Sequence, residues 1–131
     1  MHLDKQLSVF MENRPGALAA MCDALAELGI NLLAMTVSDT VDHAVVRIVV
    51  DKPDEAVHAL GEAHMLVVES DVLVAELPNR PGMLAQVAHR LADGQMNIEY
   101  AYCAANADQE TGTLVLRVAD PAAALAQLQN L

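Results

Sequence analysis

Asn13-Arg14-Pro15-Gly16-Ala17-Leu18-Ala19 recurs 66 residues later as Asn79-Arg80-Pro81-Gly82-Met83-Leu84-Ala85. At the same offset, and with no gap, Asn31 matches Asn97. Self-similarity at a fixed period is the signature of a repeated supersecondary unit. This run therefore predicts that the chain of 131 residues is built from two related units.

Periodicity predicts the same series of elements in each copy. Residues two apart are apolar before the turn, as in a half-buried strand, and helical spacing follows it. Gly29 and Gly94 stand near the ends of these helices, where a left-handed residue often closes the last turn. The other predicted elements are strands over 30–37, 44–50, 65–70, 96–103 and 113–119, and helices that begin at Pro53 and Pro121.

The order strand, helix, strand, strand, helix, strand predicts an α+β fold. It is the split βαβ, or ferredoxin-like, arrangement, an antiparallel sheet with its helices on one face. We expect one unit over residues 1–70 and a second over 71–131. The second copy ends at Leu131, where a counterpart of Met65–Ser70 would begin. The second unit is therefore expected to lack its last strand.

A missing strand would leave a bare sheet edge beside Val72–Leu77. Unpaired strand edges are normally covered in natural proteins. The favoured cover is a strand from another chain, which would make a homodimer. The alternative is that a three-stranded unit is stable on its fused neighbour.

Composition excludes several classes of protein. Seven basic and eighteen acidic residues give a net charge of −11, which would repel the phosphates of a nucleic acid. No apolar run approaches the roughly 18 residues of a membrane span. The N-terminus has no signal-peptide pattern, and Cys22 and Cys103 are too few for a disulfide framework. We expect a cytoplasmic protein with reduced cysteines that binds neither nucleic acid nor membrane.

The two Asn-Arg-Pro-Gly turns are the candidate binding sites. The proline keeps the preceding arginine out of helical geometry, and the glycine allows close backbone approach where the helix begins. The first turn of a helix carries unpaired N–H groups and partial positive charge, which favour a carboxylate or phosphate. The alternative is that Pro-Gly only starts a helix and that recent duplication explains the repetition.

Together with Gly29-Ile30-Asn31-Leu32 and Gln95-Met96-Asn97-Ile98, these turns resemble the ACT domain over about residues 5–131. The resemblance implies units that pair, commonly side by side into one sheet, and bind an amino acid at the interface near the strand-to-helix loop. It also implies a non-enzymatic regulatory protein that acts on a separate metabolic enzyme or regulator.

The resemblance also suggests which residues contact the ligand. Asparagine suits this role because its amide both donates and accepts, although it could instead cap the turn. The arginines could pair with a ligand carboxylate or remain in surface ion pairs. The candidate ligand-binding residues are Asn13, Arg14, Pro15, Gly16, Ala17, Leu18 and Asn31 in the first copy, and Asn79, Arg80, Pro81, Gly82, Met83, Leu84 and Asn97 in the second.

Other chemistries have little support. Phe10, Tyr100 and Tyr102 are the only aromatic residues, too few for a stacking cage, so a small or aliphatic amino acid is expected. The five histidines lie on unrelated elements and predict no metal site, and no cofactor motif occurs. The alternative function is a structural dimerisation or protein-interaction module without a small ligand. A third possibility is a small enzyme that uses Glu12, Asp39, His43 or Glu99.

Overall fold

The computed structural model describes residues 1–131 and divides them into two compact units. The N-terminal unit is Lys5–Ser70. The C-terminal unit joins Asp71–Leu131 to the first four residues, Met1–Asp4. The units follow the sequence repeat, except that Met1–Asp4 lie with the second copy.

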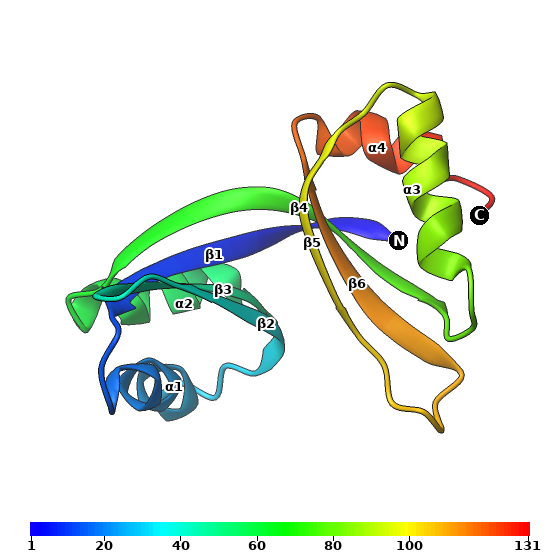
Figure 1. The fold of residues 1–131 in the computed structure, drawn as a ribbon. Coiled ribbons are helices and arrows are strands. Elements are labelled where there is room, and N and C mark those ends of the chain that lie inside the picture. The colour runs from blue at the N-terminus through cyan, green and yellow to red at the C-terminus, as the bar shows by residue number, and fades with distance from the viewer. The chain divides into compact units, whose positions relative to one another are not determined.

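The N-terminal unit has the sheet order β2-β3-β1-β4. Strand β1 pairs with β3 antiparallel, with Val9 opposite Val46. Figure 1 shows both helices of this unit on one face of its sheet. Its elements are β1 (His2–Glu12), α1 (Ala17–Glu27), β2 (Leu32–Asp39), β3 (His43–Val50), α2 (Pro53–Glu62) and the first part of β4 (Leu66–Pro78).

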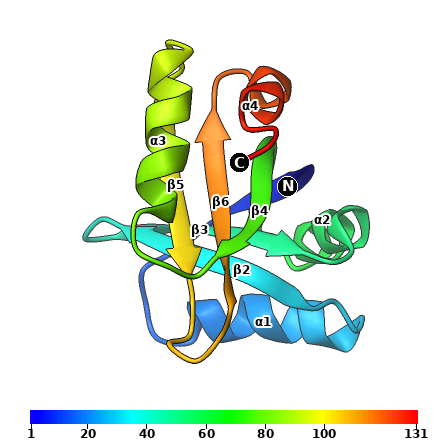
Figure 2. The same ribbon diagram turned by 90° about the vertical axis from the view of Figure 1, so that its right-hand side faces the viewer.

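The C-terminal unit repeats this arrangement with the order β1-β4-β6-β5. Strand β4 pairs with β6 antiparallel, with Leu73 opposite Leu116. In Figure 2 helices α3 and α4 lie on the viewer's side of this sheet, with β6 visible between them. The further elements are α3 (Met83–Asp93), β5 (Ile98–Ala104), β6 (Thr111–Val118) and α4 (Pro121–Gln127). The predicted pair of ferredoxin-like α+β units is confirmed. None of the four helices is long and apolar enough to span a membrane.

Each unit has a core of its own between sheet and helices. In the N-terminal unit Leu7 and Val9 of β1 pack with Met21 and Leu25 of α1. The C-terminal core has the same plan, with Leu73 of β4 among its fully buried side chains. Burial of one such side chain contributes about 1.5–3 kcal/mol, so the alternating pattern of the sequence fixes which strand face meets the helices.

The edge beside the start of the second copy is not bare, which corrects our expectation. No strand follows α4, as predicted, but the strand order places β1 next to β4, and Met1–Asp4 belong to the C-terminal unit. The reason is that β4 continues without a turn through Ser70 and Asp71. The start of β1 can therefore lie along the part of β4 that opens the second copy. Neither a strand from another chain nor a three-stranded unit is needed there.

The predicted left-handed glycine at the end of the first helix is present in the first copy and absent in the second. Gly29 closes α1 in the left-handed region, with φ 66°. After α3 that conformation belongs to Gln95, with φ 60°, and not to Gly94. Gly94 has φ −85°, and a Cβ there would meet only the end of the flexible Gln127 side chain. The prediction that Gly94 closes the helix in the left-handed region was therefore wrong.

Candidate functional site

The repeated turns connect the end of a strand to the start of a helix in both units. Gly16 and Gly82 precede α1 and α3 with φ of 87° and 90°, which any other residue adopts only at a cost of about 1–2 kcal/mol. The backbone N–H of Asn13 donates to the carbonyl of Asp42, and that of Asn79 to Glu110. Each turn is thus attached to the hairpin that closes the same end of its sheet.

Part of each helix start has unpaired backbone amides. The amides of Ala17 and Met83 donate to the carbonyls of Arg14 and Arg80, at 3.3 and 3.4 Å. The amides of Gly82, Leu84 and Ala85 form no hydrogen bond, nor do their counterparts at Gly16, Leu18 and Ala19. These unpaired groups favour negative charge. A carboxylate cradle at these turns remains a prediction.

The side chains of Asn13 and Asn79 hold the neighbouring hairpin and do not cap their own turn. Nδ2 of Asn13 donates to the carbonyl of Thr40 at 3.1 Å. Nδ2 of Asn79 donates to the carbonyls of Asn106 and Gln109, both at 2.9 Å. An amide nitrogen has two hydrogens, so only Oδ1 of Asn79 is left for a ligand. Oδ1 can accept from an ammonium group but cannot donate to a carboxylate.

Asn31 and Asn97 lie away from the turns. The backbone N–H of Asn31 donates to Oδ1 of Asp51 at 2.9 Å, at the start of β2. The eleven residues of α1, about 16 Å of helix, separate that point from Gly16. Asn97 has the same place at the far end of α3. Within each unit the loop residues and the second-strand asparagine therefore lie at opposite ends of the helix.

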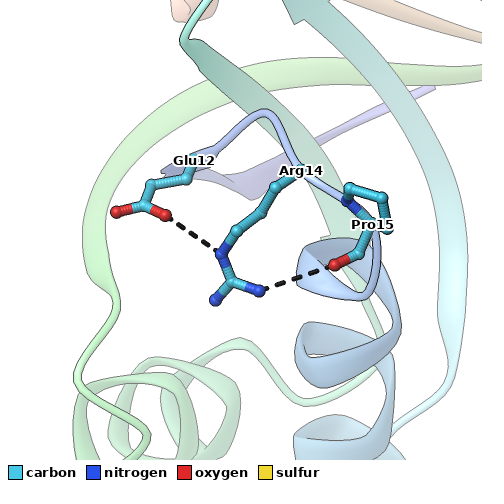
Figure 3. A network of polar contacts seen from close by, with 3 residues as sticks. All are labelled: Glu12, Arg14 and Pro15. Carbon is cyan, nitrogen blue, oxygen red and sulfur yellow. Dashed lines mark hydrogen bonds and ion pairs between the residues drawn. The ribbon is translucent and has the colours of Figure 1, made fainter.

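The two arginines of the repeat have different surroundings. Nε of Arg14 lies 3.0 Å from Oε2 of Glu12, and Nη1 donates to the carbonyl of Pro15 at 3.5 Å. Figure 3 shows this guanidinium between the carboxylate and the carbonyl. The counterpart of Glu12 is Pro78, which has no charge, and the side chain of Arg80 forms no hydrogen bond or ion pair.

A pocket of about 260 Å³ opens at the turn of the C-terminal unit. Its lining combines the predicted turn with residues of the β5–β6 hairpin, which sequence reasoning missed. The only available signal was the change of repeat offset from 66 to 70, which marks a longer hairpin in the second copy. The lining residues are Leu77, Pro78, Asn79, Arg80, Met83, Leu84, Cys103, Ala104, Ala105, Gly112, Thr113 and Leu114.

The corresponding recess of the N-terminal unit is polar. It is lined by Glu12, Asn13, Arg14, Val41, Asp42 and His43, so four of its six residues can carry charge. In the C-terminal pocket Arg80 is the only charged residue among the twelve. No group of three or more His, Cys, Asp or Glu side chains could hold a metal ion. The two copies thus differ most where the sequence repeats most closely.

The sequence and fold of the chain are similar to those of known proteins. A family model described as the ACT domain pair matches residues 1–128. The chain belongs to the ACT domain pair family. A solved protein from Bacteroides thetaiotaomicron is 35% identical to this ACT pair, with a TM-score of 0.90, and the match covers 97% of this chain and 87% of that one.

Two more distant structures share the fold of the ACT pair. The regulatory subunit of aspartate kinase from Thermus thermophilus, in its ligand-free form, is 22% identical with a TM-score of 0.67, over 96% of this chain and 92% of that one. The corresponding subunit from Thermus flavus is 20% identical with a TM-score of 0.61, over the same shares. No curated protein matches the sequence of this ACT pair.

Proposed function

We propose that this ACT pair is a non-enzymatic regulatory protein that binds a small or aliphatic amino acid near its strand-to-helix turns. The observation that carries the proposal is the C-terminal pocket, which is mainly apolar and has unpaired backbone amides at its edge. Specific small-ligand sites have this composition, an apolar lining with a few polar groups that fix orientation.

The polar groups of the pocket suit the two ends of an amino acid. The free amides of Gly82 and Leu84 favour a carboxylate, and Oδ1 of Asn79 accepts from an ammonium group. Leu77, Met83 and Leu114 offer an apolar surface to the side chain. At about 260 Å³ the pocket is smaller than the 300–1,000 Å³ typical of drug-sized ligands, which supports a small ligand.

A homodimer is part of the proposal, through a different edge from the one first considered. Strands β2 and β5 are the outer strands of their units. Strand β2 exposes Leu33, Met35 and Val37, with 54%, 44% and 46% of their surface accessible. A long apolar edge strand is a template for pairing with another chain. Pairing of two copies along β2 would join their ACT units, and pairing along β5, whose Cys103 and Ala104 line the C-terminal pocket, would place the ligand beside the interface.

In this proposal ligand binding changes the pairing of ACT units, and a separate metabolic enzyme or regulator responds. A ligand shifts such an equilibrium only as far as it binds one arrangement more tightly than the other. Regulatory subunits of aspartate kinase share the fold of this ACT pair, which supports a regulatory role. A cytoplasmic location remains a prediction.

The test is a thermal-shift screen of the purified chain against the twenty amino acids. A ligand that binds only the folded state raises the melting temperature by mass action. We expect a shift for small or aliphatic members, reduced in Ala104→Leu, which adds bulk to the pocket lining. The matched control is Ala92→Leu, an exposed position of α3 outside the pocket.

The second candidate function is a dimerisation module without a small ligand, which the apolar edge of β2 favours on its own. It predicts stable assembly and no thermal shift with any amino acid at millimolar concentration. A folded, dimeric protein that fails the whole screen would establish this alternative and end the sensor proposal.

A further inference from the structure

We propose that the two turns of this ACT pair are not equivalent, and that only the C-terminal one binds an amino acid, with Arg80 as the partner of its carboxylate. This inference rests on the proposed function and states which of the two repeated sites acts. It also explains why Arg80 is left without a partner.

The first step concerns the N-terminal turn, where the chain itself supplies the carboxylate. Glu12 holds Arg14 at 3.0 Å, and the carbonyl of Pro15 accepts from the same guanidinium (Figure 3). A ligand carboxylate would have to displace Glu12 and remain beside it. Asp42 lines the same recess and adds a second negative charge. Like charges at short range oppose binding, so this turn discriminates against an anion.

The second step concerns the C-terminal turn, where no carboxylate holds the arginine. Glu110 takes the place of Asp42 beside Asn79, but it does not line the pocket. Pro78 stands in the place of Glu12, and no acidic residue lines the pocket. The guanidinium of Arg80 is therefore free, on a planar group suited to bidentate contact with a carboxylate. The unpaired amide of Leu84 adds a donor from a lining residue, and that of Gly82 lies next in the chain to Met83, another lining residue.

The third step concerns the apolar part of the ligand. The recess of the N-terminal unit has Val41 as its one apolar side chain, and 90% of that valine's surface is accessible. The pocket of the C-terminal unit includes Leu77, Met83 and Leu114, of which Met83 and Leu114 are only 5% and 3% exposed. Only the C-terminal turn combines an unpaired arginine with a mainly apolar pocket lining.

The experiment measures amino-acid binding by calorimetry, with the twenty standard L-amino acids and their carboxamides as probes. We expect one ligand per chain. Arg80→Ala should weaken binding of the amino acid about tenfold or more, the effect of losing a charge-assisted hydrogen bond. Arg80→Ala should change binding of the carboxamide far less, because the carboxamide has no charge. Arg14→Ala should leave both affinities unchanged.

A substitution at Pro78, the position where the two turns differ, tests the proposal without changing Arg80. Pro78→Glu restores in the second turn the carboxylate that captures Arg14 in the first, and should weaken binding about as much as Arg80→Ala. Glu12→Gln is the matched control and should leave binding unaltered. Circular dichroism and the melting temperature of each variant without ligand show that it folds.

The outcomes separate this inference from the proposed function. Two ligands per chain, or equal losses in Arg14→Ala and Arg80→Ala, would overturn the inequivalence and leave the sensor standing. Equal losses of amino acid and carboxamide in Arg80→Ala would overturn the carboxylate role. No binding of any probe by the unaltered chain would contradict the proposed function itself, and this inference with it.

Discussion

The side-chain amide of Asn79 lies 2.9 Å from the carbonyl oxygen of Gln109, thirty residues away in the sequence, and donates a hydrogen bond to it. A second bond of 2.9 Å joins the same nitrogen to Asn106. This one side chain therefore ties the repeated turn of the C-terminal unit to the β5–β6 hairpin that completes the pocket. It has a structural role whether or not a ligand binds.

Asn79→Ala removes both bonds and is expected to lower the free energy of unfolding by about 1–2 kcal/mol. Urea denaturation followed by circular dichroism measures this change. Asn97→Ala is the control, because its exposed side chain forms no hydrogen bond, and it should stay within about 0.5 kcal/mol of the unaltered protein. Equal losses in the two variants would show that the bonds to the hairpin contribute nothing.

Gly82→Ala is expected to destabilise the protein by about 1–2 kcal/mol for a purely conformational reason. A Cβ at Gly82 would meet no atom within 4 Å, but φ is 90°, a region that other residues avoid. Gly61→Ala, with equal space and an ordinary helical backbone in α2, should be neutral or stabilising by up to about 1 kcal/mol. Thermal unfolding of the pair checks the opposite signs.

Gln95→Gly is expected to raise the free energy of unfolding by about 1 kcal/mol. Gln95 occupies the left-handed region after α3, with φ 60°, where glycine has no steric cost. Gln86→Gly, at an exposed position inside the same helix, should lower stability by about 1 kcal/mol. Chemical denaturation measures the change in the free energy of unfolding of each variant. Changes of the same sign in the two variants would contradict the role of backbone conformation.

Leu91→Ala tests the core of the C-terminal unit. Leu91 is fully buried in α3, so its truncation should cost about 2–5 kcal/mol, the transfer energy plus that of the cavity left behind. Leu28→Ala, at a position with 51% of its surface accessible, should cost far less. The two midpoints of urea unfolding should therefore be well separated.

Val37→Lys tests the proposed pairing of copies along β2. A charged residue on an edge strand opposes association with another chain. Sedimentation equilibrium is expected to show a weaker dimer for this variant and an unaltered one for Val41→Lys, whose site is 90% exposed in the turn after β2. An undiminished dimer in Val37→Lys would place the interface elsewhere.

The sequence predicted a candidate site at each turn, but it did not predict how the two sites differ. The repeat and the helix-initiating Pro-Gly follow from residues close together in the chain, and both turns have the expected conformation. The hairpin half of the pocket did not follow, because Cys103, Gly112 and Leu114 reach it only when β5 and β6 pair beside β4. The motif also could not show that Asn31 and Asn97 lie away from the turns, because it gives the order of residues along the chain and not the distances between them in space.

The sequence by itself determined the two-unit organisation, the order of strands and helices, the faces that form each core and the glycine turns. These features depend on periodicity and backbone preference within a few neighbouring residues, which any reader of the chain can see. Only the tertiary structure decided that Met1–Asp4 lie with the C-terminal unit, that Asn79 holds a hairpin, and that Arg14 is paired while Arg80 is free. Most of these outcomes arise between residues brought together from distant parts of the chain. For the arginines, a single change from Glu12 to Pro78 was visible in the sequence, but its consequence depended on where the side chains lie.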